Sequence, residues 1–249
     1  MSIENNLLNP PLTATDLDLA INAIIAVADD IKTNSNKVNL KNKEEIFRKW
    51  NRYSNKKNNH FNSPIFRALY ISGLYKRRVD CFYNLLMSFE SHEDIKEFIK
   101  TCENVASLGC GAAPEVLAYI KFLRCHLECT RLNLNFIGYD SIGEWDIYID
   151  VLKGHLDNRV TLDFKKLTID TNYISEMSQG GACLMSYSHW SRFPDIWELL
   201  KTKFHLIIVL DVKDKLMQSK MQKCGYNSKY FTDTNCNESA KQFYYYFTQ

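Results

Sequence analysis

Apolar residues change their spacing near residue 104 of this 249-residue chain. Before that point they recur every three or four positions, which is the spacing of one helical face. Beyond it, short apolar runs alternate with helical patterns, as in an open parallel sheet whose helices connect the strands. The pattern predicts a helical N-terminal extension or lid over residues 1–100 and an α/β domain over residues 101–249.

Individual elements follow from the same pattern. N-terminal helices are expected over 15–31, 43–53, 63–73, 79–89 and 95–100, with a break at Gly73 and polar loops over 33–43 and 54–62. Strands are expected over 105–108, 134–139, 160–169, 182–187, 204–210, 229–232 and 241–248. Helices among these strands are expected over 114–129, 144–155, 194–202 and 214–223.

The stretch from Val105 to Glu115 predicts a buried strand, a tight turn and the start of a helix. Gly109 and Gly111 give the turn backbone freedom and leave room for a ligand beside the main chain. Pro114 suits the first helical turn, where its missing N–H is tolerated. Ligands of open α/β sheets bind beyond the carboxyl ends of the strands, so this turn is a candidate site.

A second strand ends in a carboxylate, Asp140, about thirty residues after the glycine turn. A carboxylate in that place can accept both hydroxyl groups of a ribose. A nicotinamide dinucleotide site is disfavoured, because Pro114 replaces the third glycine of the G-x-G-x-x-G fingerprint. The spacing from the glycines to Asp140 is also long for that fingerprint.

Residues 105–140 resemble the first β-α-β unit of class I methyltransferases that use S-adenosylmethionine (SAM). The resemblance implies a Rossmann-like seven-stranded, mostly parallel sheet with an antiparallel last strand, SAM as cofactor and methyl transfer as the activity. Ser107 stands where the family usually has an acidic residue, and Ala113 stands where a third glycine is common.

The resemblance also implies a set of residues around SAM. Gly109 and Gly111 fall on the loop that cradles its methionine end, and Asp140 falls on the acid that binds its ribose. Asp170 resembles the acid that binds the adenine amino group, with Asp163 as the fallback. The full set of expected cofactor-binding residues is Ser107, Gly109, Cys110, Gly111, Asp140, Trp145, Asp170 and Ser186. For the Trp145 ring, packing between helix and sheet is slightly favoured over contact with adenine.

The residues after the fourth strand are the candidates for catalysis. His189 can act as a base near neutral pH, and Tyr187 or Trp190 can stack on a planar substrate. The alternative is that these residues cap the sheet and hold the methionine end of SAM. The Asn/Asp-Pro-Pro-Tyr motif, which the family uses on amino and amide nitrogens, is missing there.

Positive charge is concentrated between residues 37 and 78. Twelve Lys and Arg face only two Glu in this segment, a net charge of +10, while the whole chain carries +2. Aromatic residues are interleaved with these cations, as in polyanion-binding surfaces. The alternative is a solvated helical face whose aromatic residues belong to the core.

Composition adds few constraints. The eight cysteines are scattered, which predicts reduced core residues of an intracellular protein, cytoplasmic or nuclear. Cys125 and Cys129 have no second ligand pair at zinc-finger spacing, so no metal is expected. No apolar run is long enough to span a membrane, and residues 1–6 lack the pattern of a secretory signal.

Three functions follow from these observations. The first is a SAM-dependent methyltransferase acting on an RNA base or other nucleic-acid target, which the basic segment 37–78 binds. A loose likeness to fungal ribosomal-RNA uridine methyltransferases favours it. The second is a small-molecule N- or O-methyltransferase with a helical lid, and the third is a non-catalytic methyltransferase-like subunit.

Overall fold

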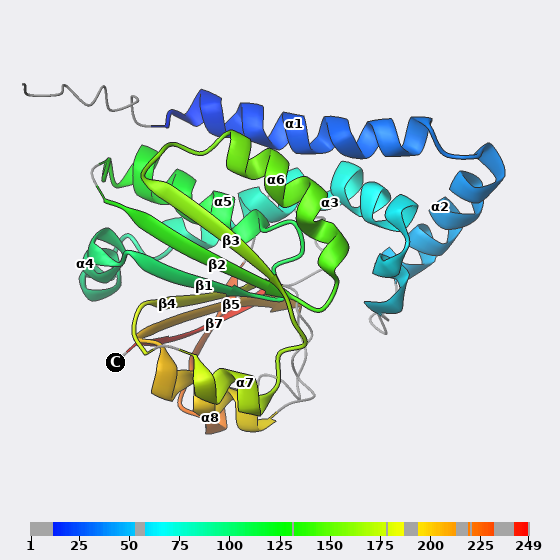
Figure 1. Ribbon diagram of the computed structural model, residues 1–249. Helices are drawn as coiled ribbons and strands as arrows, with labels where there is room; N and C mark the ends of the chain where they lie inside the picture. The colour runs from blue at the N-terminus through cyan, green and yellow to red at the C-terminus, as the bar shows by residue number, and fades with distance from the viewer. Residues whose placement is uncertain are drawn as a thin grey trace, which may run out of the picture.

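The computed structural model describes residues 12–52, 58–130, 132–177, 179–186, 194–212, 219, 221–231 and 242–248. A single sheet forms its centre, with strand order β3-β2-β1-β4-β5-β7-β6 (Figure 1). Its seven strands are β1 (Asn104–Leu108), β2 (Leu134–Asp140), β3 (Val160–Lys166), β4 (Ala182–Ser186), β5 (Leu206–Val212), β6 (Asn227–Phe231) and β7 (Gln242–Thr248).

Strands β1 to β5 are parallel, and β7 runs antiparallel to both β5 and β6. The Rossmann-like α/β architecture and the antiparallel last strand are therefore confirmed. The strand order reverses at β1, which has β2 on one side and β4 on the other. This reversal makes the carboxyl ends of β1 and β4 the topological switch point, where such sheets bind ligands.

Helices cover both faces of the sheet. They are α1 (Ala14–Thr33), α2 (Lys37–Arg52), α3 (Pro64–Met87), α4 (Glu93–Thr101), α5 (Pro114–Lys121), α6 (Asp146–Gly154), α7 (Thr171–Glu176) and α8 (Pro194–Lys203). Short helical turns are η1 (Asn58–Asn62), η2 (Phe122–His126) and η3 (Gly143–Trp145). In Figure 1, α5 and α6 lie on one face with α1 and α3 beyond them, and α7 and α8 lie on the opposite face.

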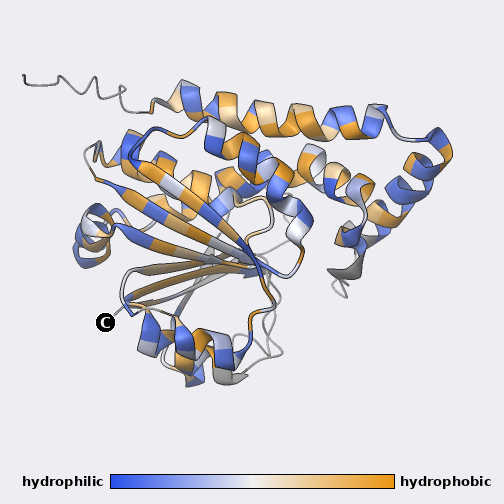
Figure 2. Ribbon diagram, viewed as in Figure 1, coloured by the Kyte–Doolittle hydropathy of each residue, from blue (hydrophilic) through white to orange (hydrophobic). Residues whose placement is uncertain are grey.

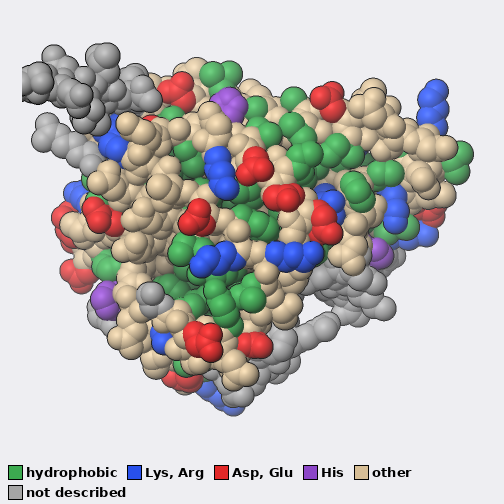
Figure 3. Space-filling view, viewed as in Figure 1, with side chains coloured by type: hydrophobic (Ala, Val, Ile, Leu, Met, Phe, Trp, Pro, Cys, Tyr) green, Lys and Arg blue, Asp and Glu red, His purple; other side chains and the backbone are tan. Residues whose placement is uncertain are grey.

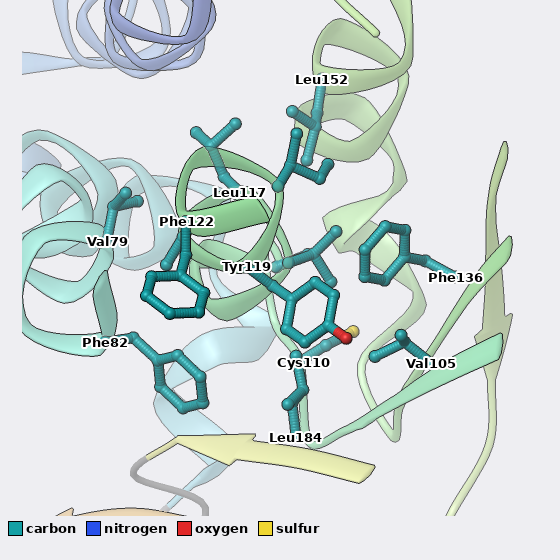
Figure 4. Close-up of a cluster of buried hydrophobic side chains, with 14 of the residues drawn as sticks. Val79, Phe82, Val105, Cys110, Leu117, Tyr119, Phe122, Phe136, Leu152 and Leu184 are labelled. Atoms are coloured by element: carbon teal, nitrogen blue, oxygen red, sulfur yellow. The ribbon is translucent and has the colours of Figure 1, made fainter. Parts of the chain in front are cut away.

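Alternation along the central strands divides the core into two clusters. Val105 of β1 packs into the cluster beneath α5, whereas Leu108 packs into the cluster beneath α7 and α8. Figure 4 shows the first cluster, in which Tyr119 and Phe122 lie between α3 and the sheet. Figure 2 shows the corresponding apolar bands on the strands and on the covered faces of α1 and α5. The N-terminal helices therefore share one core with the sheet.

Local capping explains where the N-terminal helices begin. Thr13 and Asp16 form a capping box at α1, with the Thr13 backbone N–H donating to Asp16 Oδ2 over 2.8 Å. The Asn36 side chain accepts the Val38 N–H at 2.9 Å, so α2 begins at Lys37 and not at 43 as predicted. The predicted loop over 33–43 is wrong for this reason.

The predicted break at Gly73 is also wrong. Helix α3 continues through it to Met87, because Gly73 lies on an exposed face and a Cβ there would meet only the Phe47 ring at ordinary contact distance. Isolated glycine disfavours a helix without ending it. Ser63 caps this helix and Pro64 occupies its first position, as the sequence indicates.

Two boundaries beyond the glycine turn differ from prediction. The helix predicted over 114–129 ends as an α-helix at Lys121 and continues as a π-helical turn, η2. Strand β3 ends at Lys166, and the six-residue helix α7 was not predicted. Its N-cap is Asp170, whose carboxylate accepts the Tyr173 N–H at 2.9 Å. Among the helices that the structure describes, none is long and apolar enough to cross a bilayer.

The turn before β4 gives a test of this packing. Gly180 and Gly181 both have positive φ, but a Cβ on Gly181 would overlap the backbone oxygen of Asn104, whereas one on Gly180 would meet open space. We predict that Gly181→Ala lowers the free energy of unfolding by roughly 2–5 kcal/mol, through strain and overpacking together. Gly180→Ala, the matched control, should lower it by about 1–2 kcal/mol. Equal losses in urea denaturation would contradict the register of β1 against β4.

Candidate functional site

The turn between β1 and α5 is bound to the end of β2. The N–H groups of Gly109 and Cys110 both donate to the Tyr139 carbonyl oxygen, at 2.7 and 3.1 Å. Gly109 and Gly111 have φ of 66° and 52°, so both positions favour glycine. Ala113 also adopts a left-handed conformation, φ 56° and ψ 48°, where the resemblance expects a third glycine.

Asp140 lies directly against this turn. Its Oδ2 accepts the Gly111 N–H and its Oδ1 accepts the Ile142 N–H, each at 2.9 Å. Burial raises the pKa of Asp140, and the N–H donors and the Trp145 side chain partly offset that rise. A carboxylate oxygen can accept more than one hydrogen bond, so both oxygens retain the capacity to accept a ligand hydroxyl.

Trp145 packs against the same turn and interacts with Asp140. Its indole is 3% exposed, and a Cβ on Gly111 would lie 3.6 Å from it. Phe61 of η1 and Tyr70 of α3 contact the same indole, with ring centroids 5.4 and 6.0 Å away. The helical extension therefore reaches the candidate site. Packing of Trp145 between helix and turn is observed, and its contact with adenine stays a prediction.

Glu115 is a site residue that the sequence analysis did not identify as one. It is the second residue of α5, and its side chain is fully buried. Ser107 at the end of β1 donates to its Oε1, and Ser186 at the end of β4 donates to its Oε2 at 2.7 Å. The carboxylate thus bridges the two strands that form the switch point.

Burial raises the pKa of Glu115 to about 7, although the hydroxyl groups of Ser107 and Ser186 act against that rise. Asp140 adds to it through charge repulsion. The position next to an apolar helical run, Val116 and Leu117, was the only sequence signal for this burial. A half-ionised carboxylate at neutral pH is typical of functional sites.

The remaining predicted residues occupy different surroundings. Cys110 is buried, and a Cβ built on Gly138 would lie 2.9 Å from its sulfur. The Cys110 side chain therefore packs in the core against β2. Asp170 is exposed and caps α7, and Asp163 is exposed on β3. Neither has a contact with the turn among the described hydrogen bonds. Tyr187, His189 and Trp190 lie outside the described residues, so their catalytic roles stay predictions.

Within the basic segment 37–78, some side chains are buried in the core and others are exposed to solvent. Phe66, Arg67 and Tyr75 are buried, and the Arg67 guanidinium donates to the Phe61 carbonyl oxygen at 2.5 Å. These residues therefore belong to the helical core. The exposed cations of its described helices are Lys37, Lys41, Arg48, Lys49, Lys76 and Arg77. Figure 3 shows Lys and Arg side chains at the end of the molecule formed by α2.

Within the described ranges, no group of three or more His, Cys, Asp or Glu side chains could hold a metal ion. The seven cysteines described there are free thiols.

No protein-family model matches the sequence, and no curated protein matches it. Among solved structures, the chain is similar to magnesium protoporphyrin IX methyltransferase from Synechocystis PCC 6803 with bound SAM. That similarity has a TM-score of 0.47 and 10% identity, over 77% of this chain and 94% of that one.

It is also similar to precorrin-6y C5,15-methyltransferase from Geobacter metallireducens, with a TM-score of 0.41 and 11% identity over 59% of this chain and 82% of that one. Fibrillarin from Aeropyrum pernix, in complex with SAM, has a TM-score of 0.42 and 5% identity, over 59% of this chain and 68% of that one. At such identities the similarity concerns the fold and not the activity.

The raised pKa of Glu115 predicts a pH-dependent stability. The folded chain keeps a proton on this carboxyl up to about pH 7, whereas an unfolded chain releases it near 4.5. Rising pH therefore favours the unfolded state, and the free energy of unfolding should fall by about 2–3 kcal/mol between pH 5 and pH 8 through this group. Glu115→Gln should remove that dependence and be more stable than the wild type at pH 8.

Urea denaturation at both pH values measures the effect, with exposed Glu176→Gln as the control. If the difference between wild type and Glu115→Gln stays the same at both pH values, Glu115 is not a buried, half-ionised group.

Proposed function

We propose that the protein is a SAM-dependent methyltransferase. The observation that carries this proposal is the contact between the glycine turn and Asp140, which places a carboxylate and a strained, glycine-containing backbone at one edge of the sheet. Binding of SAM would need both features. The carboxylate would accept the ribose hydroxyl groups, and the glycines of the turn would leave room for the methionine end.

The described residues fit such a cofactor. Gly111 lets the Trp145 indole pack directly against the turn, and Asp140 is anchored by two N–H groups. Bound SAM would supply a methyl group on a positively charged sulfur. The protein's contribution is then alignment, because methyl transfer to a well-placed nucleophile needs little further assistance. Ser107, Ser186 and Glu115 would line the end of the site at β1 and β4.

Binding of the demethylated product tests this proposal. We expect titration calorimetry to detect S-adenosylhomocysteine at sub-millimolar concentration. Asp140→Ala should weaken that binding by roughly 10- to 100-fold, because hydrogen bonds to a charged group contribute about 1.5–3 kcal/mol. Asp150→Asn, at an exposed carboxylate on α6, is the matched control and should bind as the wild type does. An Asp140 variant with unchanged affinity would remove the ribose assignment, and a wild type that does not bind would favour a non-catalytic subunit.

The acceptor that we propose is an RNA base or another nucleic-acid target. Helix α2 supports this choice: Lys37, Lys41 and Arg48 share one exposed stripe at helical spacing, while Leu40 and Phe47 fall about a quarter turn away around the helix. The helix lies on the side of the molecule toward which β1, β2 and β3 point (Figure 1). Phosphate groups bound along α2 would place a base near the switch point.

The buried aromatic residues change the expected mode of binding. Phe66 and Tyr75 belong to the core, so the segment would bind phosphate by charge more than by stacking. The contact of Phe61 with Trp145 supports the second candidate, a small-molecule methyltransferase in which η1 closes the site. Salt dependence distinguishes the two, because counterion release accompanies phosphate contacts only.

Charge reversal on α2 tests the nucleic-acid target. RNA retention on a filter should weaken steeply with salt, and Lys41→Glu with Arg48→Glu should reduce the slope of log affinity against log salt by about 2. The matched control reverses Lys153 and Lys223, two exposed lysines far from α2 in the chain. A wild type that does not retain RNA would favour a small-molecule acceptor. An equal change of slope in the control would locate RNA binding elsewhere.

A further inference from the structure

Ser107, Glu115 and Ser186 form a hydrogen-bonded trio where β1, β4 and the start of α5 meet. Ser107 pairs in register with Leu184 of β4, so Ser186 lies two residues further and faces the same side of the sheet. Helix α5 covers that side, and its first turn brings Glu115 between the two hydroxyl groups. Three elements therefore converge on a single carboxylate.

The trio is an unfavourable way to stabilise a fold. Burying a carboxylate is costly unless a cation or several strong donors offset the loss of hydration. Two neutral hydroxyl groups hold the Glu115 oxygens, and burial still dominates its pKa. A buried group retained in spite of such a penalty is typical of a functional site.

Several described groups near Glu115 are neutral or negative at neutral pH. Asp140 from β2, Tyr70 and Tyr75 from α3, and Cys110 from the turn all interact with it electrostatically. Arg78, on α3, is hydrogen-bonded to Tyr70. A positively charged ligand group near this set would relieve the repulsion between Glu115 and Asp140.

The exposure of each residue in the trio indicates which one can contact a ligand. Glu115 and Ser107 are fully buried, whereas Ser186 is part-exposed at the end of β4. The Ser186 hydroxyl donates its proton to Glu115, so toward a ligand its oxygen can act only as an acceptor. An ammonium group that donates to Ser186 would then lie one hydroxyl group away from a negative charge.

We propose that Ser186 and Glu115 form the subsite for the positively charged amino group of the cofactor, with the Ser186 hydroxyl in contact and the Glu115 carboxylate as the positioning charge behind it. This inference rests on the proposed function. In this proposal, Glu115 on α5 takes the place of the acidic residue that class I methyltransferases usually have at the position of Ser107. It also implies that binding of the ammonium group requires ionised Glu115.

Three nucleoside probes separate this subsite from the rest of the site. They are S-adenosylhomocysteine, its analogue without the amino group, and 5′-methylthioadenosine, which lacks the amino-acid end. We expect Glu115→Gln to weaken S-adenosylhomocysteine by roughly 10- to 100-fold, as for a lost interaction with a charged group. Both probes without an amino group should bind the wild type and Glu115→Gln equally, because the variant keeps the size of the side chain.

A pH series supplies the readout that a structural role would not move. Wild-type affinity for S-adenosylhomocysteine should fall about tenfold from pH 8 to pH 6, as Glu115 becomes protonated. Glu115→Gln should show no such change, and the wild type should bind the amino-free analogue equally at both pH values. Ser186→Ala should weaken S-adenosylhomocysteine selectively as well.

Other outcomes overturn the inference. If Glu115→Gln weakens all three probes equally, the residue has only a structural role. If it leaves the affinity for S-adenosylhomocysteine unchanged at pH 8, the amino group binds elsewhere, although the proposed function stands. If the wild type binds none of the probes, the proposed function itself fails, and this subsite fails with it.

Discussion

The hydrogen bonds between the β1–α5 turn and the end of β2 are the constraint on which the rest of the site depends. One carbonyl oxygen, that of Tyr139, accepts two successive N–H groups of the turn, and the next residue, Asp140, accepts a third. These contacts fix the direction in which α5 leaves the sheet. They therefore also decide that Glu115, on the first turn of α5, points between β1 and β4. The turn, Asp140 and the buried carboxylate of Glu115 form one connected unit.

This unit concentrates negative charge at the switch point of the sheet. Asp140 and Glu115 repel each other, and burial raises the pKa of both carboxyl groups. Such an arrangement lowers the stability of the unliganded chain at neutral pH, since a buried charge is disfavoured. Functional sites often lower the stability of the unliganded protein, because they hold charged groups that bind a ligand of opposite charge. The expected pH-dependent stability of the chain and the proposed ligand recognition thus depend on the same side chain, Glu115.

Sequence patterns predicted the parts of the structure that local chemistry determines. The strand, glycine turn and helix of residues 105–121 follow from apolar runs and from two glycines, and Asp140 from its place at a strand end. The start of α2 was missed because an asparagine cap inside a polar stretch looks like a loop. Glu115 was missed because its burial depends on β4, a strand almost seventy residues away in the chain. Pairing between distant strands leaves no local signal, so the half of the site made by Ser186 and Glu115 required the fold.

A crystal structure of the protein with S-adenosylhomocysteine tests the central claim most directly. The account predicts that both ribose hydroxyls lie within hydrogen-bond distance of the Asp140 carboxylate, with the amino-acid end over the glycine turn and toward Ser186. A nucleoside bound away from this edge of the sheet, or an Asp140 that contacts only the backbone of the turn in the complex, would contradict it.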